Sequence, residues 1–296
     1  MRMVVTGRDG QVVRSIVERA NDSDVDVIPL GRPDLDLAGP ADAVMEAVER
    51  ARPDVLVSAA AYTQVDRAEA ESDLAFAINE RGSRALARAS DTMGVPIIHL
   101  STDYVFDGLK PEPYVEDDPT EPAGVYGASK LAGERAVLEA NPNSVVLRTA
   151  WVYSPFGTNF VKTMLRLAGE RDEVRVVADQ RGNPTSALDL ADGIMAIAHR
   201  LKGSSDAAQR GVFHMVGRQE ASWAELAEAV FGAAAKSAGP RARVVPISTA
   251  DYPTAARRPA NSRLDCNKLA RIYGIELPEW RPSLESVVTR LVQTSV

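Results

Sequence analysis

The segment MVVTGRDGQVVRSIVERA, residues 3–20, contains the pattern that decides the fold class. A short apolar run ends at Thr6, a turn with Gly7 and Gly10 follows, and residues 12–20 have helical spacing. A strand, a glycine-containing turn and a helix together direct backbone N–H groups at the pyrophosphate of a dinucleotide. Two glycines are weak evidence alone, because an ordinary strand-to-helix turn uses them equally well.

Apolar strands continue to alternate with amphipathic helices along the chain. We expect further strands at 26–30, 54–58, 95–101 and 144–149, with helices at 41–51 and 72–93. This alternation predicts an α/β fold, a Rossmann-like, doubly wound parallel sheet that binds ligands at the carboxyl ends of its strands. We assign residues 1–153 mainly to an NAD(P)-binding Rossmann domain. Residues 154–296 would form a smaller, mainly substrate-binding region, with some segments returning to the sheet.

Composition and charge exclude several classes of protein. With 296 residues, 45% of them hydrophobic and 25% charged, the chain can bury a substantial core. The net charge of −7 argues against broad nucleic-acid binding. No segment is long and apolar enough to span a membrane. We expect no signal peptide, because a strand begins beside Met1. The single cysteine, Cys266, fits a reducing cytoplasm, where we expect the protein.

Metal binding is not expected either, because the three histidines lack metal-ligand spacing. They are His99, His199 and His214.

Tyr126 and Lys130 are the pair of residues most indicative of chemistry. They follow the strand at 95–101 and a Pro-rich loop at 109–122, where a helical pattern begins. Residues four apart are neighbours on one face of a helix. A nearby ammonium favours the phenolate and lowers the pKa of a tyrosine, which suits it to proton transfer. The sequence therefore predicts a proton-transfer pair at the carboxyl end of the fourth strand.

Arg32 bears on the choice of dinucleotide, because it directly follows the second strand and Gly31. The residue at that point approaches the adenosine ribose, where an acidic side chain favours NAD and an arginine can pair with the 2′-phosphate of NADP. The alternative is a solvated loop arginine. At the end of the third strand, small residues from Ala59 to Ala61 would let a flat cofactor approach the backbone.

Assembled, these stretches resemble the extended short-chain dehydrogenase/reductase superfamily over nearly the full length and, within it, the dTDP-4-dehydrorhamnose reductases. The motifs occur in the family's order: GRDGQV (7–12), AAAYTQVD (59–66), STDYVFDG (101–108), VYGASKLAGE (125–134), RTAWVYS (148–154), NFVKTML (159–165), DQRGNPT (179–185) and RPANSRLD (258–265). The resemblance implies reduction of the C4 ketone of dTDP-4-dehydro-L-rhamnose, a nucleotide sugar, with NADPH or alternatively NADH.

The resemblance also implies roles for individual residues. Tyr126 would protonate the C4 oxygen, Lys130 would tune the tyrosine and bond the nicotinamide ribose, and Thr102 would hold the ketone. The expected substrate-binding residues are Thr102, Asp103, Tyr104 and Trp151. The expected cofactor-binding residues are Gly7, Gly10, Gln11, Val12, Arg32, Asp36, Leu37, Ala61, Tyr62, Thr63, Tyr126 and Lys130. Charge alone makes three arginines candidates for the diphosphate or for loop stabilisation: Arg257, Arg258 and Arg263.

Two departures from the family's pattern matter. Val13 stands where a small residue allows close packing of the first helix, so we expect an adjusted turn. Some relatives bind Mg²⁺ at a dimer interface through glutamates, and Ser15 and Leu188 occupy those positions here. Neither supplies a carboxylate, so we expect no metal, and both a monomer and a homodimer stay open.

Two other functions remain as alternatives. One is a non-catalytic regulatory subunit like that of methionine adenosyltransferase, which shares this fold and much of the motif order. The other is an epimerase or dehydratase of another nucleotide sugar.

Overall fold

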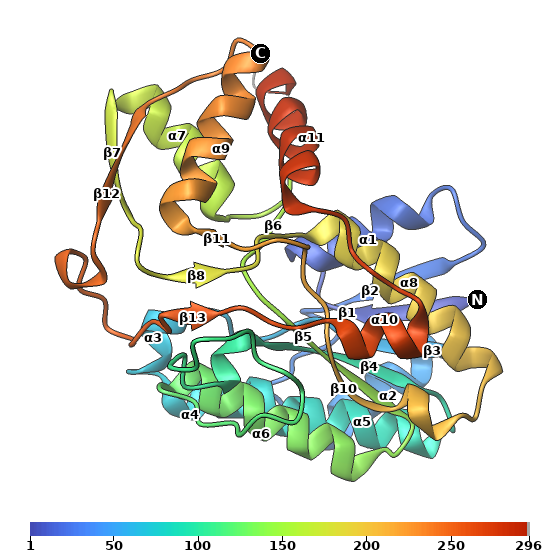
Figure 1. Ribbon diagram of the computed structural model, residues 1–296. Coiled ribbons are helices and arrows are strands. Elements are labelled where there is room, and N and C mark those ends of the chain that lie inside the picture. The colour runs from blue at the N-terminus through green and yellow to red at the C-terminus, as the bar shows by residue number, and fades with distance from the viewer. Residues whose placement is uncertain (295–296) are drawn as a thin grey trace.

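The computed structural model describes residues 1–294 and has a six-stranded parallel sheet at its centre (Figure 1). Its order is β10-β5-β4-β3-β1-β2, built from β1 (Arg2–Thr6), β2 (Asp26–Leu30), β3 (Val55–Ser58), β4 (Ile97–Thr102), β5 (Ser144–Thr149) and β10 (Gly211–His214). Each neighbouring pair is parallel. The predicted doubly wound, Rossmann-like sheet is therefore confirmed.

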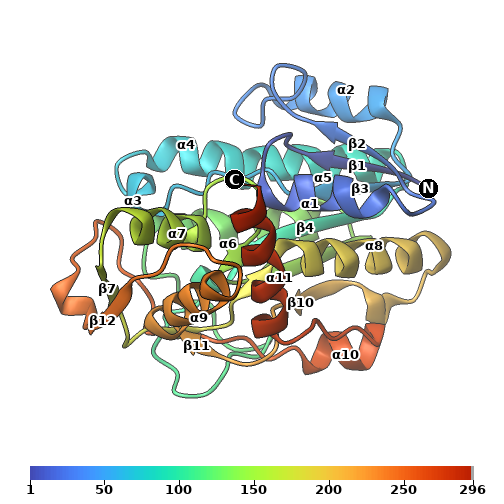
Figure 2. The same ribbon diagram turned by 90° about the horizontal axis from the view of Figure 1, so that it is seen from above.

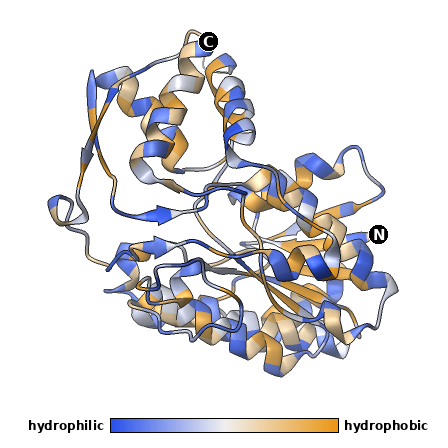
Figure 3. Ribbon diagram, in the orientation of Figure 1, coloured by the Kyte–Doolittle hydropathy of each residue, from blue (hydrophilic) through white to orange (hydrophobic). Residues whose placement is uncertain are grey.

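Alternate strand residues face two apolar cores, as the two-residue repeat of a strand requires. Met3 and Val5 pack in one core, whereas Val4 packs in the other. The first core lies under α1 (Gln11–Ala20), α8 (Ala187–Gly203) and α10 (Asn267–Tyr273). The second lies under α2 (Ala41–Ala51), α5 (Ser83–Thr92) and α6 (Val125–Ala140). Figure 1 shows α1 and α8 above the sheet and α5 and α6 below it, and Figure 2 views the same arrangement from above. Figure 3 shows apolar residues concentrated in the strands between the helices.

The strand order places a crevice beside the first strand. From β1 the chain passes outward to β2 and then back to β3 on the other side of β1. Such a reversal leaves a gap at the carboxyl ends of the two strands, where doubly wound folds bind ligands.

The helix expected at 72–93 is divided into three parts. They are α4 (Ser72–Phe76), a π-helical turn η1 (Ala77–Gly82) and α5. A Cβ on Gly82 would lie 2.6 Å from the Leu37 carbonyl oxygen, so this turn packs against the loop after β2. The wider turn also carries Asn79, which is fully buried.

The C-terminal region has an apolar cluster of its own. It is built from α7 (Phe160–Glu170), α9 (Trp223–Lys236), α11 (Trp280–Gln293) and the parallel pair β7 (Glu173–Val177) with β12 (Arg243–Ile247) (Figure 1). A three-stranded sheet, β11-β8-β13, connects this region to the rest; its strands are β11 (Ala221–Ser222), β8 (Arg181–Gly182) and β13 (Asn261–Ser262). Shorter elements complete the chain: α3 (Val65–Ala68), η2 (Asp103–Val105), β6 (Val152–Tyr153), β9 (Thr185–Ser186), η3 (Ala207–Gln209) and η4 (Thr249–Asp251).

Within residues 1–294, none of the helices combines the length and apolar character needed to cross a bilayer.

Candidate active site

The turn after β1 leaves its backbone open to a ligand. Gly7 has φ 101°, a left-handed conformation that glycine adopts without strain. Gly10 caps α1 without a side-chain hydrogen bond, so the first N–H groups of the helix keep their donor capacity. A Cβ on Gly7 would lie 3.2 Å from Val13 Cγ2, so the buried Val13 packs over the bare glycine. The turn thus accommodates the branched residue at position 13, and Val12 packs against the core beneath.

A pocket opens beside this turn, at the carboxyl ends of β1, β2 and β3. Of the expected cofactor-binding residues, it is lined by Gly7, Arg32, Asp36, Leu37 and Ala61. Arg8, which the sequence did not single out, also lines it and forms an ion pair with Asp34. Arg32 is exposed at the same pocket. Two guanidinium groups beside a glycine turn fit the 2′-phosphate and ribose of a dinucleotide.

Side chains from other elements hold the loop after β3 by hydrogen bonds to its backbone. Thr6 Oγ1 accepts hydrogen bonds from the N–H groups of Ala59 and Ala60, at 3.0 and 2.9 Å. The Tyr62 N–H donates to Asn79 Oδ1 at 2.8 Å, and Asn79 Nδ2 donates to the Tyr62 carbonyl at 3.1 Å. The Tyr62 hydroxyl is bound to Glu71 at 2.6 Å. Tyr62 is therefore held by the protein through both its backbone groups and its hydroxyl, and the adjacent Thr63 is exposed.

Gln11 connects the glycine turn to the segment after β5. Its amide nitrogen donates to the Val152 carbonyl at 3.3 Å. Its amide oxygen accepts from Ser154 at 2.9 Å and from Asn159 at 3.0 Å. The side chain is thus committed within the protein, and the backbone N–H of Gln11 is the group available to a phosphate.

Thr102, Asp103 and Tyr126 meet where β4 ends and α6 begins. The side chains of Tyr126 and Thr102 share a hydrogen bond. Thr102 Oγ1 also donates to Asp103 Oδ1 at 3.0 Å. A Cβ on Gly127 would lie 2.1 Å from the Tyr104 carbonyl oxygen, so the glycine is what lets α6 approach β4 this closely. The side chains expected to act on a ketone therefore form one hydrogen-bonded group.

The pKa of Tyr126 differs from the expectation. Burial of its hydroxyl raises the pKa above the usual value, Asp103 raises it further, and the Thr102 hydrogen bond only partly offsets this. Lys130 does not provide the expected lowering, because its ammonium donates instead to the Leu100 carbonyl at 2.6 Å. The phenol is consequently protonated at neutral pH, which is the state that a proton donor requires.

Lys130 and Asp103 have shifted pKa values of their own. Burial lowers the pKa of Lys130 to about 8, against the opposing effect of Glu134. Burial raises the pKa of Asp103 to about 6, although hydrogen bonds from Ser262 and Thr102 favour its charged form. Asp103 Oδ2 is buried and has no partner among the described residues. A buried carboxylate oxygen without a partner is a ready acceptor for a substrate hydroxyl.

A buried ion pair supports the strand ends below the site. Arg148 on β5 pairs with Glu134 on α6 at 2.8 Å, with side chains 4% and 2% exposed. Glu134 Oε1 also accepts from Ser101 at 2.5 Å. Ser101 and Arg148 are cross-strand partners in β4 and β5. This network therefore fixes the two strands just before Thr102 and connects them to the helix that carries Lys130.

The ring of Tyr104 packs against the ring of Tyr126. Their rings meet edge to face, with centroids 5.5 Å apart. The Tyr104 hydroxyl accepts from Arg258 at 3.0 Å, and Arg258 also pairs with Asp66 after β3. Arg258, one of the three arginines considered for the diphosphate, thus connects the C-terminal segment to the site.

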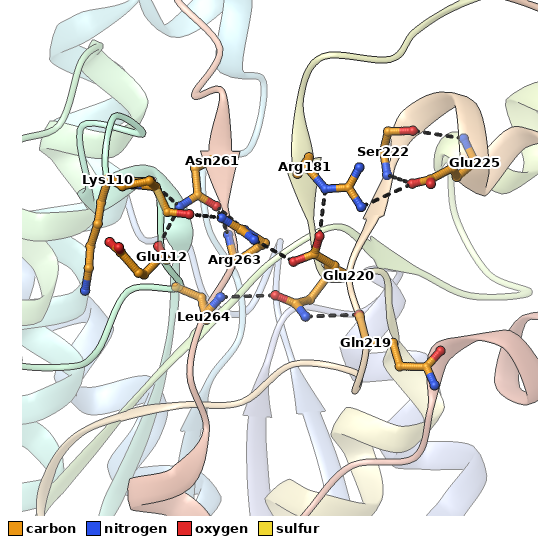
Figure 4. Close-up of polar contacts among 12 residues, drawn as sticks. Lys110, Glu112, Arg181, Gln219, Glu220, Ser222, Glu225, Asn261, Arg263 and Leu264 are labelled. Atoms are coloured by element: carbon orange, nitrogen blue, oxygen red, sulfur yellow. Dashed lines mark hydrogen bonds and ion pairs between the residues drawn. The ribbon is translucent and has the colours of Figure 1, made fainter.

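The other two candidate arginines lie differently. Arg263 is held by Glu220 at 2.6 Å and by Asn261 at 2.8 Å (Figure 4). That arrangement favours the loop-stabilising alternative for Arg263. Arg257 is exposed and acts electrostatically on Asp107.

The positions compared with metal-binding glutamates have ordinary packing roles. Ser15 is buried and donates from Oγ to the Gln11 carbonyl at 2.8 Å. Leu188 packs against the C-terminal apolar cluster.

Sequence reasoning missed Arg8, Asn79 and Glu134, as well as Gly182 and Trp223, which both contact Trp151. Glu134 had a usable signal, because it lies four residues after Lys130 on the same helix. Trp223 had a weaker one, since it follows Ser222 within a capping box that marks a helix start. Asn79 had none, because nothing local predicts the π-helical turn that carries it.

Comparison with known proteins identifies the family of this chain. The family model described as the RmlD substrate binding domain matches residues 1–293. A dTDP-4-dehydrorhamnose reductase of Sinorhizobium fredii is 53% identical, covering 99% of this chain and 98% of its own. The crystal structure of one from Clostridium acetobutylicum gives a TM-score of 0.90 at 37% identity, over 98% of this chain and 99% of that one. One from Bacillus anthracis, in complex with NADP, gives 0.90 at 38% identity, over the same shares of 98% and 99%.

Proposed function

Because this chain belongs to the RmlD substrate binding domain family, we propose that it reduces the C4 ketone of dTDP-4-dehydro-L-rhamnose with NADPH or NADH. The observation that carries this proposal is the buried Tyr126 hydroxyl, whose raised pKa keeps the phenol protonated. It is bonded to Thr102 at the end of β4, in the sheet whose β1 turn and pocket suit a dinucleotide. The chemistry of these groups supports reduction of a carbonyl.

A nicotinamide dinucleotide, when bound, supplies the hydride. Tyr126 gives its proton to the C4 oxygen, so the C=O becomes a CH–OH group and the phenolate is later reprotonated from solvent. Thr102 would hold the ketone oxygen by turning its single O–H away from Asp103, and the Asp103 carboxylate would then accept from a sugar hydroxyl. Lys130, with a pKa of about 8, remains mostly cationic at neutral pH, and an ammonium bonded to the Leu100 carbonyl has further N–H donors for a ligand.

For the cofactor, we assign the pyrophosphate to the backbone at Gly10, Gln11 and Val12. The pocket residues Gly7, Arg32, Asp36, Leu37 and Ala61 would hold the adenosine half, with Tyr62 and Thr63 at its edge. Support comes from the positive φ of Gly7 and from the uncapped start of α1. Lys130 would bond the nicotinamide ribose.

We extend the proposal to the organisation of the chain. Residues 1–153 would mainly bind the cofactor and residues 154–296 mainly the sugar nucleotide, with Arg257 and Arg258 candidates for its diphosphate. A cytoplasmic location is consistent with the unpaired Cys266. Both a monomer and a homodimer are compatible with the site, because all the residues named come from one chain.

Turnover distinguishes this proposal from its alternatives. The protein would be mixed with NADPH and with dTDP-4-dehydro-L-rhamnose generated from dTDP-glucose by a dehydratase and an epimerase, and absorbance of the reduced cofactor followed. A stoichiometric, sugar-dependent loss of NADPH is expected. An epimerase would cause no net loss, and a non-catalytic regulatory subunit would leave both compounds unchanged.

A further inference from the structure

Trp151 has a strained backbone conformation, which contacts with the surrounding structure must maintain. Its φ is 48°, in the left-handed region that non-glycine residues rarely adopt. It lies two residues beyond Thr149, the register partner of Thr102, and so at the edge of the sheet that carries the site. Its side chain packs against the C-terminal apolar cluster and also against the cluster around Phe106 and Leu131.

Trp223 covers one face of the Trp151 indole. The two rings are stacked, with centroids 3.6 Å apart and planes 10° apart. Trp223 is itself fixed, because its Nε1 donates to Gln180 Oε1 at 3.2 Å. It also opens α9 directly after Ser222, which forms a capping box with Glu225. The stack is therefore anchored at a helix start.

Gly182 covers the opposite face. A Cβ on Gly182 would lie 2.5, 2.7 and 2.9 Å from Trp151 Cε2, Nε1 and Cζ2. Nε1 and Cζ2 are both bonded to Cε2 and lie on either side of it in the ring plane. A Cβ position that is almost equally far from all three atoms must therefore lie over a face of the ring and not in its plane. Trp223 fills the space over the first face, so Gly182 must lie over the second.

One small sheet contains Gly182 and leads directly into Trp223. Gly182 in β8 pairs with Ala221 in β11, two residues before Trp223, and with Ser262 in β13. Ser262 in turn hydrogen-bonds the side chain of Asp103. The sheet thus contacts the two expected sugar-binding residues Trp151 and Asp103 at once.

Ion pairs at the ends of the same strands hold this sheet together. Glu220 accepts from Arg181 at 2.8 Å and from Arg263 at 2.6 Å, and Figure 4 shows it between the two guanidinium groups. Asn261 donates to the carbonyl oxygens of Lys110 and Glu112 at 2.6 and 2.8 Å. The sheet is therefore also tied to the Pro-rich loop at 109–122.

We propose that Trp223 and Gly182 are positioning residues that clamp the Trp151 indole so that the sugar meets its edge and not its face. This inference rests on the proposed function. With both faces covered, the indole cannot stack on the carbon side of a hexose ring. Its edge is the electropositive part of the ring, and the Nε1–H is a hydrogen-bond donor. The clamped indole therefore selects for ring or hydroxyl oxygens at that side of the sugar.

Substitution of Trp223 tests the proposal kinetically. In Trp223→Leu, Trp151 loses its stacking partner, and we expect KM for the nucleotide sugar to rise roughly tenfold, the equivalent of one aromatic pair. The dissociation constant of NADPH should stay at the wild-type value. Trp223→Phe keeps an aromatic face and should recover most of the loss. Unchanged KM in Trp223→Leu, or equal damage to NADPH binding, would overturn the proposal.

Circular dichroism tests the clamp without turnover. Two stacked indoles couple their far-ultraviolet transitions and give a paired signal of opposite signs. We expect this couplet in the wild-type protein and in Trp280→Phe, and its loss in Trp151→Phe and Trp223→Phe. A couplet of wild-type size in Trp151→Phe or Trp223→Phe would contradict the clamp. A wild-type protein with the couplet but no sugar-dependent NADPH oxidation would instead contradict the proposed function.

Discussion

Thr102 and Tyr126 come from different elements, the end of β4 and the start of α6, and their side chains share a hydrogen bond. The bond exists because Gly127 lets the helix approach the Tyr104 carbonyl and because the N–H of Val125 is capped by Glu69 at 2.9 Å. It places a protonated phenol beside a second hydroxyl at the carboxyl edge of the sheet. This arrangement is the basis of the predictions below.

Removing the Tyr126 hydroxyl should abolish most of the activity. We expect Tyr126→Phe to reduce kcat by about 10²- to 10⁴-fold, the usual contribution of a positioned proton donor. NADPH binding, measured by fluorescence titration, should not change. Tyr252→Phe is the matched control, because Tyr252 is 59% exposed. Wild-type activity in Tyr126→Phe would remove the residue from the mechanism.

Asp103 should cost stability when it is ionised. Its folded pKa of about 6 is above the ordinary value of 3.8, so the folded state binds more protons between these pH values and stability falls as pH rises through them. At pH 7 we expect Asp103→Asn to raise the free energy of unfolding by up to about 3 kcal/mol. Urea unfolding from pH 4 to 7.5 measures this, and the gain should shrink toward pH 4. A gain that does not vary with pH would refute the ionisation argument.

Glu134 should contribute strongly to the stability of the folded protein. Glu134→Gln leaves the buried Arg148 without its charge partner, so we expect a loss of about 3–5 kcal/mol in unfolding free energy. The control is Glu139→Gln on the same helix, where Glu139 pairs with Arg84 and is 71% exposed. That change should cost less than about 1 kcal/mol. Equal effects of the two substitutions would show that burial does not set the cost.

Two helical glycines should respond in opposite ways to alanine. Gly127→Ala places a Cβ 2.1 Å from the Tyr104 carbonyl oxygen, so α6 must move and both stability and activity should fall. In Gly232→Ala no atom lies within 4 Å of the new Cβ, and α9 should gain about 0.5–1 kcal/mol. Thermal unfolding of the two variants is the measurement. A stabilised Gly127→Ala would contradict the close approach of α6 to β4.

Arg32 should discriminate between the two dinucleotides. We expect Arg32→Ala to raise KM for NADPH roughly tenfold by loss of a charge-assisted contact to the 2′-phosphate. KM for NADH should be unaffected. Arg50→Ala, at an exposed site on α2, should change neither constant. If both cofactors lost affinity equally, Arg32 would be contacting a part that they share.

Local patterns were sufficient for most of the fold, but not for the packing between distant segments. The helix at 41–51 and the strands at 26–30 and 144–149 have their expected bounds, because apolar spacing and turn residues mark them locally. The division of 72–93 was missed, since it depends on the packing of Gly82 against Leu37. Likewise, no local signal shows that Gly182 would face Trp151 or that Lys130 would bond Leu100.

The site shows the same limit. The helical spacing of Tyr126 and Lys130 located the pair, and the family motifs named its neighbours. The direction of the Tyr126 pKa shift could not be predicted, because it depends on burial and on Asp103, which only the folded structure brings near.

Isotope transfer tests the central claim most directly. NADPH deuterated at both C4 positions would be incubated with the protein and dTDP-4-dehydro-L-rhamnose, and the sugar product analysed by mass spectrometry and NMR. We predict dTDP-L-rhamnose with one deuterium at C4 of the sugar and one equivalent of NADP⁺. A product without deuterium at C4, or no product in the presence of bound cofactor, would contradict the account.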